Sequence, residues 1–501
     1  MSIKGARFAI AALLVTVAGM LTACSKAEEK AAAAPPPPQS TKLPITTASE
    51  EARKEFLAGR DLAERLLATD SIQHFDKAIA LDPKFAFAEL SRANVAPTAQ
   101  EFFDHLAKAV SLAGAASNGE RLLILASEAG ANNNPQKQLD YLQQLEAAYP
   151  NDERAHFNLG GYYFGQQDFP KAIEQYKKAA ELNSSYSPVF NILGYAYRQN
   201  GDFANAEQAF KKYIELIPND PNPYDSYAEL LLKMGKFDQS IEQYQKALAV
   251  DQNFVNSHSG IAAALMYQGK PAEAAAELEK LSGKARTDGE RRTALFAETV
   301  VAADNGKIQD AIALVDKQYA LGEKTKDVPA MAGDLQLKGI LLAESGKPAD
   351  AQAQFERALK MTEDSNLSQA NKENARTGQH QNLALVSLAK KDYAGAKSHA
   401  DEYLKGVESR SNPAQVRQAH GLLGRVALEQ KDYDTAIAEL GKGNQQDPAV
   451  LYRTCLAYEA KGDHAKAKDF CANAAEFNSL PQINYALVRA KAKKLADRIK
   501  T

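Results

Sequence analysis

Four of the eight histidines deserve a first look, because clustered imidazole side chains bind divalent metal ions. They are His156, His258, His380 and His420. Each stands at the fourth position of a segment that recurs along the chain, so the four are expected on different structural units, far apart. This spacing favours a packing role over a metal site, and we assign no metal ligand.

Two cysteines near the end of the chain, Cys455 and Cys471, are expected on two facing helices, with both side chains pointing inward. A disulfide between them would persist in an oxidising compartment outside the cytoplasm. A disulfide requires the two Cα atoms to lie within about 7 Å of each other. Because the two cysteines are offset by about one helical turn, the distance between their Cα atoms is expected to be close to that limit. The sequence leaves two alternatives open, a disulfide or two buried free thiols.

Motifs of common catalytic sites are missing from the sequence. We find no Walker loop, no Gly-rich dinucleotide fingerprint, no His-Glu-x-x-His and no Cys-x-x-Cys. Carboxylates are abundant, but no pair stands out as a buried acid and base. We therefore predict that the protein is not an enzyme and needs no cofactor.

Composition excludes several classes of protein. The 501 residues are 45% hydrophobic and 25% charged, as in folded proteins. Lys and Arg number 60 against 63 Asp and Glu, a net charge of -3, so no basic field attracts nucleic acid. Only one apolar run approaches membrane length, at the extreme N-terminus, which excludes a polytopic membrane protein.

The first residues have the layout of an export signal. Lys4 and Arg7 precede an apolar stretch, which ends in Leu21-Thr22-Ala23-Cys24. These four residues resemble the lipobox of bacterial lipoproteins, which implies a signal peptide over 1–23 and lipidation of Cys24. By the same resemblance, Ser25 favours the outer membrane, with the mature protein facing the periplasm and held by its acyl chains. The alternative is an ordinary signal peptide, or a short uncleaved anchor, that happens to end in Cys.

Residues 24–49 are predicted to form the lipidated cysteine and a disordered linker. They contain a run of alanines over 31–34 followed by a run of prolines over 35–38, a composition that buries little apolar surface and favours extended chain. The linker would separate the folded body from the membrane.

Self-similarity with a period of 34 residues runs through the body of the chain. Gly160 recurs as Gly194, and Tyr176 recurs as Phe210. The intervening apolar residues follow helical spacing. A small residue in one helix lets a second helix approach closely, and the aromatic residue is expected to fill the gap beside that contact. The pattern resembles the tetratricopeptide repeat, a helix-turn-helix unit.

The resemblance implies an all-α, right-handed superhelical solenoid of about twelve tetratricopeptide repeats. Regular repeats are expected over 50–283, an irregular array with insertions such as 362–374 over 284–480, and a basic capping helix over 481–501. The units are expected to begin near Ala52, Ala86, Gly119, Glu153, Ser187, Pro221, Val255, Arg292, Ala332, Thr377, Arg417 and Pro448.

In such a superhelix the first helix of each unit lines an extended inner groove. Aromatic anchors beside amide and charged groups in this groove suit an extended peptide or a partner helix. The residues expected to face the groove are Arg154, Phe157, Phe164, Asn191, Tyr195, Arg198, Asp225, Glu229, Asn256 and Ser259.

These inferences predict a membrane-anchored scaffold of the bacterial cell envelope, which binds partner proteins or peptides through the groove. Export or assembly of an envelope component is the expected context. The alternative is a periplasmic module that binds a small molecule or glycan, although the absence of Trp weakens it. The sequence leaves the oligomeric state open.

Overall fold

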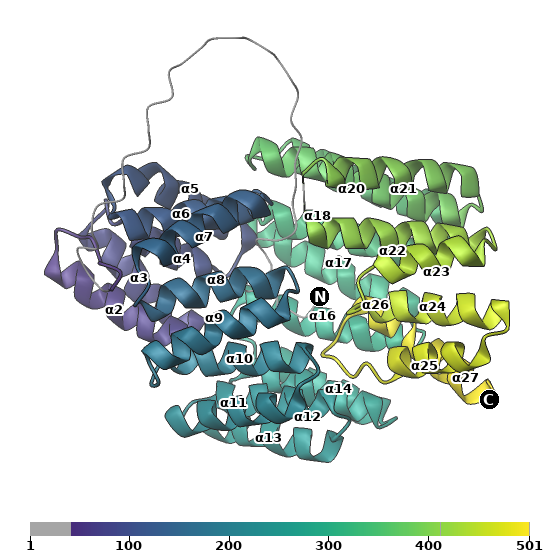
Figure 1. Ribbon diagram of the computed structural model, residues 1–501, viewed down its shortest axis with the longest axis horizontal. Coiled ribbons are helices and arrows are strands. Elements are labelled where there is room, and N and C mark those ends of the chain that lie inside the picture. The colour runs from purple at the N-terminus through teal and green to yellow at the C-terminus, as the bar shows by residue number, and fades with distance from the viewer. Residues whose placement is uncertain (1–41, 411, 500–501) are drawn as a thin grey trace, which may run out of the picture.

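The computed structural model describes residues 42–410 and 412–499. The predicted signal peptide, Cys24 and most of the predicted linker therefore lie outside the described residues. Figure 1 shows antiparallel helix pairs stacked side by side into an all-helical solenoid, and the described ranges contain no strand. Within the same ranges, no helix combines the length and the apolar character needed to cross a membrane.

Twelve successive helix pairs form the body of the described chain, and we call each pair a unit. The first six units are α2/α3 (Glu50–Glu64, Ala68–Leu81), α4/α5 (Ala86–Asn94, Ala99–Leu112), α6/α7 (Asn118–Ala131, Pro135–Ala148), α8/α9 (Glu153–Gly165, Phe169–Leu182), α10/α11 (Ser187–Gln199, Phe203–Leu216) and α12/α13 (Pro221–Lys233, Phe237–Val250). A short 3-10 helix, η2 (Ala113–Ala115), follows α5.

The other six units are α14/α15 (Val255–Tyr267, Pro271–Lys284), α16/α17 (Asp288–Asp304, Ile308–Thr325), α18/α19 (Val328–Glu344, Pro348–Glu363), α20/α21 (Gln369–Ala389, Tyr393–Glu408), α22/α23 (Pro413–Glu429, Tyr433–Lys442) and α24/α25 (Pro448–Lys461, His464–Ala475). Two short helices, α26 (Ile483–Ala486) and α27 (Arg489–Arg498), follow them.

The residues that the irregular second half of the array has in addition to the 34-residue repeat lie in longer helices. Helix α20 has 21 residues, whereas α12 has 13. It begins at Gln369, eight residues before the start near Thr377 that the repeat register indicates. The last part of the expected insertion 362–374 is thus helical. The stack continues across the expected boundary near residue 283, because α15 packs against α16.

Close helix contacts within a unit depend on the repeated glycine. A Cβ atom at Gly194 would lie 2.7 Å from the ring of Phe210, and one at Gly160 would lie 2.6 Å from the ring of Tyr176. The aromatic side chain therefore packs directly on the glycine, whereas the sequence suggested that it fills the space beside the contact.

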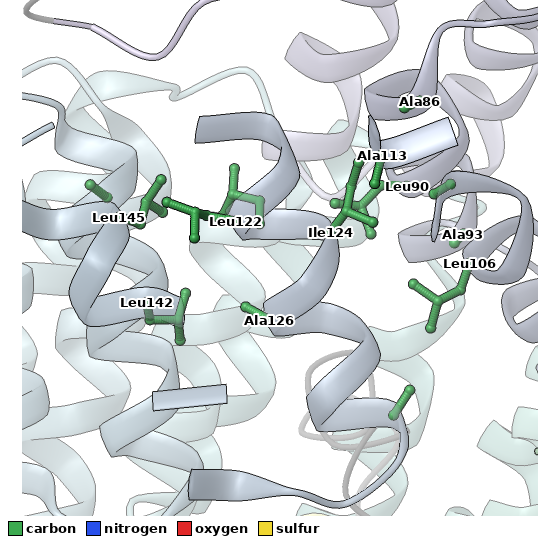
Figure 2. Packing of buried hydrophobic residues seen from close by; sticks show 14 of the residues in the cluster. Ala86, Leu90, Ala93, Leu106, Ala113, Leu122, Ile124, Ala126, Leu142 and Leu145 are labelled. Carbon is green, nitrogen blue, oxygen red and sulfur yellow. The ribbon is translucent and has the colours of Figure 1, made fainter. Parts of the chain in front are cut away.

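Each unit shares its core with its neighbours, as the stacking of repeats requires. Figure 2 shows Leu122 and Ile124 of α6 in one such cluster, with Leu142 of α7 on one side and Leu90 of α4 on the other. All four side chains are buried. The interior is a series of apolar clusters that follow one another along the stack.

Units far apart in the sequence also touch, both within the first half of the solenoid and between its two halves, which lie side by side in Figure 1. Arg65 of the first unit makes a two-pronged ion pair with Asp220 at the start of the sixth, with distances of 2.7 and 2.6 Å. Asn133 of the third unit is hydrogen-bonded to Asn412 at the start of the eleventh. These contacts join units that are far apart in the sequence.

The end of the predicted linker, residues 42–49, is non-helical and lies against the first units. The amide of Leu43 donates to Asp152 at 2.7 Å, and that of Thr46 donates to Glu120 at 2.8 Å. Leu43 also packs against the core of α4 to α7. At the other end of the chain, α27 packs on α25, the position expected for a capping helix.

Candidate functional site

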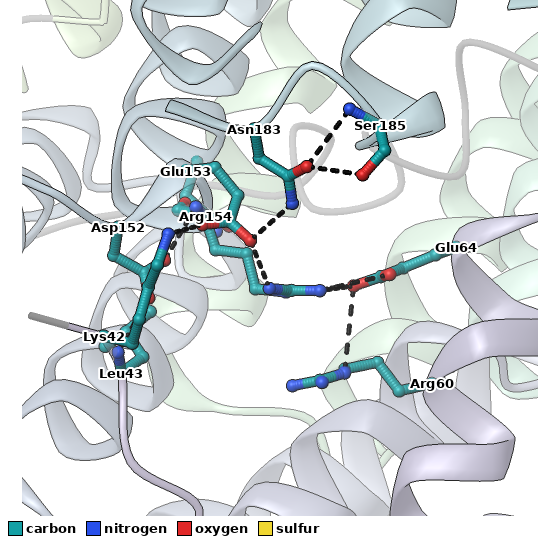
Figure 3. Close-up of polar contacts among 10 residues, drawn as sticks. Lys42, Leu43, Arg60, Glu64, Asp152, Glu153, Arg154, Asn183 and Ser185 are labelled. Atoms are coloured by element: carbon teal, nitrogen blue, oxygen red, sulfur yellow. Dashed lines mark hydrogen bonds and ion pairs between the residues drawn. The ribbon is translucent and has the colours of Figure 1, made fainter. Parts of the chain in front are cut away.

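The predicted groove residues lie on the first helices of four successive units, α8, α10, α12 and α14. Arg154 of α8 is held from two sides, as Figure 3 shows. Its guanidinium donates to Glu64 of α2 at 2.9 and 3.0 Å and to the neighbouring Glu153 at 2.9 Å. The charge of Arg154 is thus neutralised by the first unit of the same chain.

Glu153 is surrounded by donors, which Figure 3 also shows. Burial alone would raise its pKa, but hydrogen bonds from Lys42 and Asn183, with the charge of Arg154, lower the pKa of Glu153 to about 2. This carboxylate therefore stays ionised and anchors the end of the predicted linker at Lys42.

The two predicted aromatic anchors on α8 pack against other rings. Phe157 meets Tyr186 edge to face, with centroids 5.5 Å apart, and Phe164 meets Phe169 at 5.6 Å. Both are partly exposed. They contribute partly exposed apolar surface while their rings are held in place.

Helices α10 and α12 carry a connected polar network. The guanidinium of Arg198 lies 4.7 Å over the ring of Tyr195 and contacts Glu229 at 3.4 Å. The hydroxyl of Tyr195 donates to Ser226 at 3.2 Å, and burial raises the pKa of Tyr195 far above its usual range. The network positions a half-buried cation and an aromatic face next to each other.

Other predicted positions differ in exposure. Asn191 is 9% exposed and Asp225 is fully buried, with its carboxylate accepting a hydrogen bond from Ser257 at 2.7 Å. Asn256 and Ser259 on α14 are half-buried. Asn256 is therefore the position of this set on α14 that best combines a place on the inner helix with access to solvent.

The same face contains residues that the sequence analysis did not single out. Residues 476–488, which we call the crossing segment, leave α25 and run across the ends of α12, α14 and α16. Lys233 donates to the carbonyl of Phe477 at 2.6 Å and lies 3.7 Å over its ring. The hydroxyl of Tyr267 donates to the carbonyl of Ser479. Just after the crossing segment, Arg489 pairs with Asp304 at 2.7 Å.

Lys233, Tyr267 and Asp304 are the last residues of α12, α14 and α16. They occupy the thirteenth position of the units expected to begin at Pro221, Val255 and Arg292. We call these three residues the edge row. A comparison of the repeats extended to the thirteenth position of each unit would have identified the edge row. Burial, with the nearby charge of Arg198, lowers the pKa of Lys233 to about 8.

Each of the four aligned histidines faces a residue 19 positions later on the second helix of its unit. The partner is an amide or acid in three units, and His420, for example, lies 2.6 Å from Glu439. In the fourth, His380 faces His399, with Nδ1 atoms 3.3 Å apart. Within residues 42–410 and 412–499, no three His, Cys, Asp or Glu side chains gather as a metal site would require.

Cys455 and Cys471 are joined by a disulfide, with Cα atoms 5.2 Å apart. The offset of about one turn between the two positions thus keeps the Cα atoms within bridging distance. Two surface hollows lie elsewhere, one beside α19 and one on α9, and charged side chains contribute to both linings. Neither has the aromatic lining of a deep small-molecule site.

Family models for the tetratricopeptide repeat match residues 125–187, 187–220, 228–269, 259–324 and 382–448. The chain is built from tetratricopeptide repeats. The match over 259–324 spans the junction of the two expected arrays, in agreement with the continuous stack of tetratricopeptide units there. No curated protein matches the chain.

Several solved structures match part of the chain. A tetratricopeptide repeat protein from Parabacteroides merdae is 14% identical, covering 55% of this chain and 94% of its own, with a TM-score of 0.36. One from Thermus thermophilus is 20% identical, covering 43% and 99%, with a TM-score of 0.29. MamA from Desulfovibrio magneticus RS-1 is 16% identical, covering 33% and 93%, also at 0.29.

Proposed function

We propose that this tetratricopeptide repeat protein is a membrane-anchored scaffold of the bacterial cell envelope. It binds partner proteins or peptides through the inner face of its first helices. Repeat folds of this kind are typical of protein interaction scaffolds. Export or assembly of an envelope component is the context that the lipobox-like sequence before Cys24 suggests.

A single observation supports the binding function: the edge row contacts a segment from a distant part of the same chain. The crossing segment runs across three successive units, and side chains of two of them, Lys233 and Tyr267, donate to its main-chain carbonyls. A surface that holds one segment by its backbone suits others of similar shape. The Tyr195 and Arg198 network continues this surface onto α10.

Site-specific photocrosslinking tests the binding face. A photoreactive residue replaces Asn256 or Gln199, both half-buried on the inner helices, in the full-length protein in its native membranes. Lys177, exposed on the second helix α9, is the matched outer position. We expect defined protein adducts from the inner positions alone. Equal labelling from Lys177, or no adduct from any position, would contradict the proposal.

The anchor needs a separate test. We expect the Cys24→Ala variant to leave the membrane fraction, and mass spectrometry of the wild-type N-terminus to find acyl chains on Cys24. Retention of the variant in the membrane fraction would count against lipid anchoring. That outcome would not change the interpretation of the crosslinking experiment.

A further inference from the structure

The edge row shows the geometry of a built binding site. Asn478 has a left-handed backbone with a φ of 46°, so the chain turns between Phe477 and Ser479. The carbonyls of these two residues accept from Lys233 and Tyr267 respectively. Lys233 and Tyr267 stand 34 residues apart, which is one repeat period. Two successive units of the solenoid therefore each bind one carbonyl, and the two carbonyls belong to alternate residues of the segment.

Apolar contacts add to these hydrogen bonds. Leu480 packs against Leu232 of α12 and Ala263 and Ala264 of α14, all buried. Farther along, Ile483 is 8% exposed within the core of α16 to α18, and Tyr485 is 1% exposed with its ring 5.6 Å from that of Tyr267. The backbone contacts set the path of the segment, and these side chains set its register.

Charge fixes the direction of the bound chain. Lys233 stands at the end where the segment enters, and Asp304 at the end where it leaves. Asp304 is buried and holds the guanidinium of Arg489 in a two-pronged pair, while that guanidinium lies 5.2 Å from the centre of the Tyr267 ring. A segment bound in the opposite direction would leave Asp304 without its cation, which is costly for a buried charge.

We propose that the edge row is a peptide-binding site, that the crossing segment is its resident ligand, and that a partner segment of the same chemistry takes its place. The partner is a peptide with an aromatic residue first, leucine three residues later and a basic residue beyond. This inference rests on the proposed function and names the partner class for one part of the inner face.

Because the resident segment is covalently attached, it competes at a high effective concentration, of the order of millimolar for a short tether. A free peptide therefore binds weakly until the resident segment is released.

The test uses the full chain with Leu480→Asp and Arg489→Glu, which remove the apolar anchor and reverse the charge that pairs with Asp304. The probe is a fluorescein-labelled synthetic peptide of residues 476–490.

We expect the released variant to bind the probe at least tenfold more tightly than the wild type in fluorescence anisotropy. Adding Lys233→Met and Tyr267→Phe, which keep side-chain volume but remove both donors, should reduce that affinity at least tenfold. Lys236→Met, at an exposed lysine just before α13, is the matched control and should change nothing. A probe of scrambled sequence should bind no variant.

Two results would overturn the proposal. One is equal affinity of the released variant and the wild type, and the other is full binding after loss of both donors. If circular dichroism shows that the charged variant has unfolded, the milder Phe477→Ala, Leu480→Ala variant replaces it. Crosslinking at Asn256 and Gln199 does not depend on this outcome, so the scaffold function and the edge row are judged separately.

Discussion

His380 and His399 face each other across one unit with Nδ1 atoms 3.3 Å apart, where the sister units pair histidine with an acid or an amide. Burial and the positive charge of His380 lower the pKa of His399, and Asp392 partly opposes them. A lowered histidine pKa means that the folded state binds fewer protons than the unfolded state.

Stability from this pair is therefore fully present above the unfolded histidine pKa, about 6.5, and is lost as the pH falls below it. We expect the melting temperature to fall between pH 6.5 and pH 5. The His399→Glu variant recreates the pairing of His258 with Glu277 and should lose less stability over the same range. Identical pH profiles for the two proteins would contradict this assignment.

The disulfide between Cys455 and Cys471 closes a short loop in the last unit. We expect thiol titration of the denatured, unreduced protein to detect neither cysteine, and titration after reduction to detect both. Replacing both with Ser should cost about 3 kcal/mol, because the bond restricts the unfolded chain. Two reactive thiols in the unreduced protein would exclude the bond.

Gly194 is the position where added bulk meets an aromatic ring. The Gly194→Ala variant should lose about 1–3 kcal/mol of unfolding free energy, because its new Cβ atom would press on Phe210. Gly165→Ala is the control: no heavy atom lies within 4 Å of its Cβ, so the change should be neutral or stabilising. Chemical denaturation of both variants measures the difference.

Arg65 and Asp220 form an ion pair between units one and six, and the carboxylate of Asp220 is 5% exposed. Arg65→Ala leaves that buried charge without its partner and should cost about 2 kcal/mol. Arg53→Ala, which removes an exposed pair with Glu50, should cost less than about 0.5 kcal/mol. A double-mutant cycle with Asp220→Asn isolates the coupling, and a coupling near zero would mean that the contact does not hold units one and six together.

Much of the fold was predictable, because a unit is specified locally. The glycine and aromatic positions and the period of 34 residues predict helix pairs, and helices α8, α10, α12 and α14 begin at the expected residues. The longer helices of the second half were not predicted, since Gln369 and its neighbours extend a helix without any change in the repeat pattern.

The inner face was harder to predict. Arg198 and Glu229 were assigned to one surface, and the structure pairs them. The contact of Lys233 with Phe477 joins residues 244 positions apart. It depends on the small rotation between units summed over half the solenoid, and no local pattern encodes that sum. The sequence therefore indicates which helices carry these residues but not which side chains they contact.

The contacts between distant units also limit how the gene for this protein can change. Arrays of repeats commonly gain or lose whole units, because each unit touches only its neighbours. Here Arg65 must reach Asp220, and Asn133 must reach Asn412, across fixed numbers of intervening units. Duplication or deletion of one unit between them would move each side chain to the wrong partner, so the copy number of repeats is itself under structural constraint.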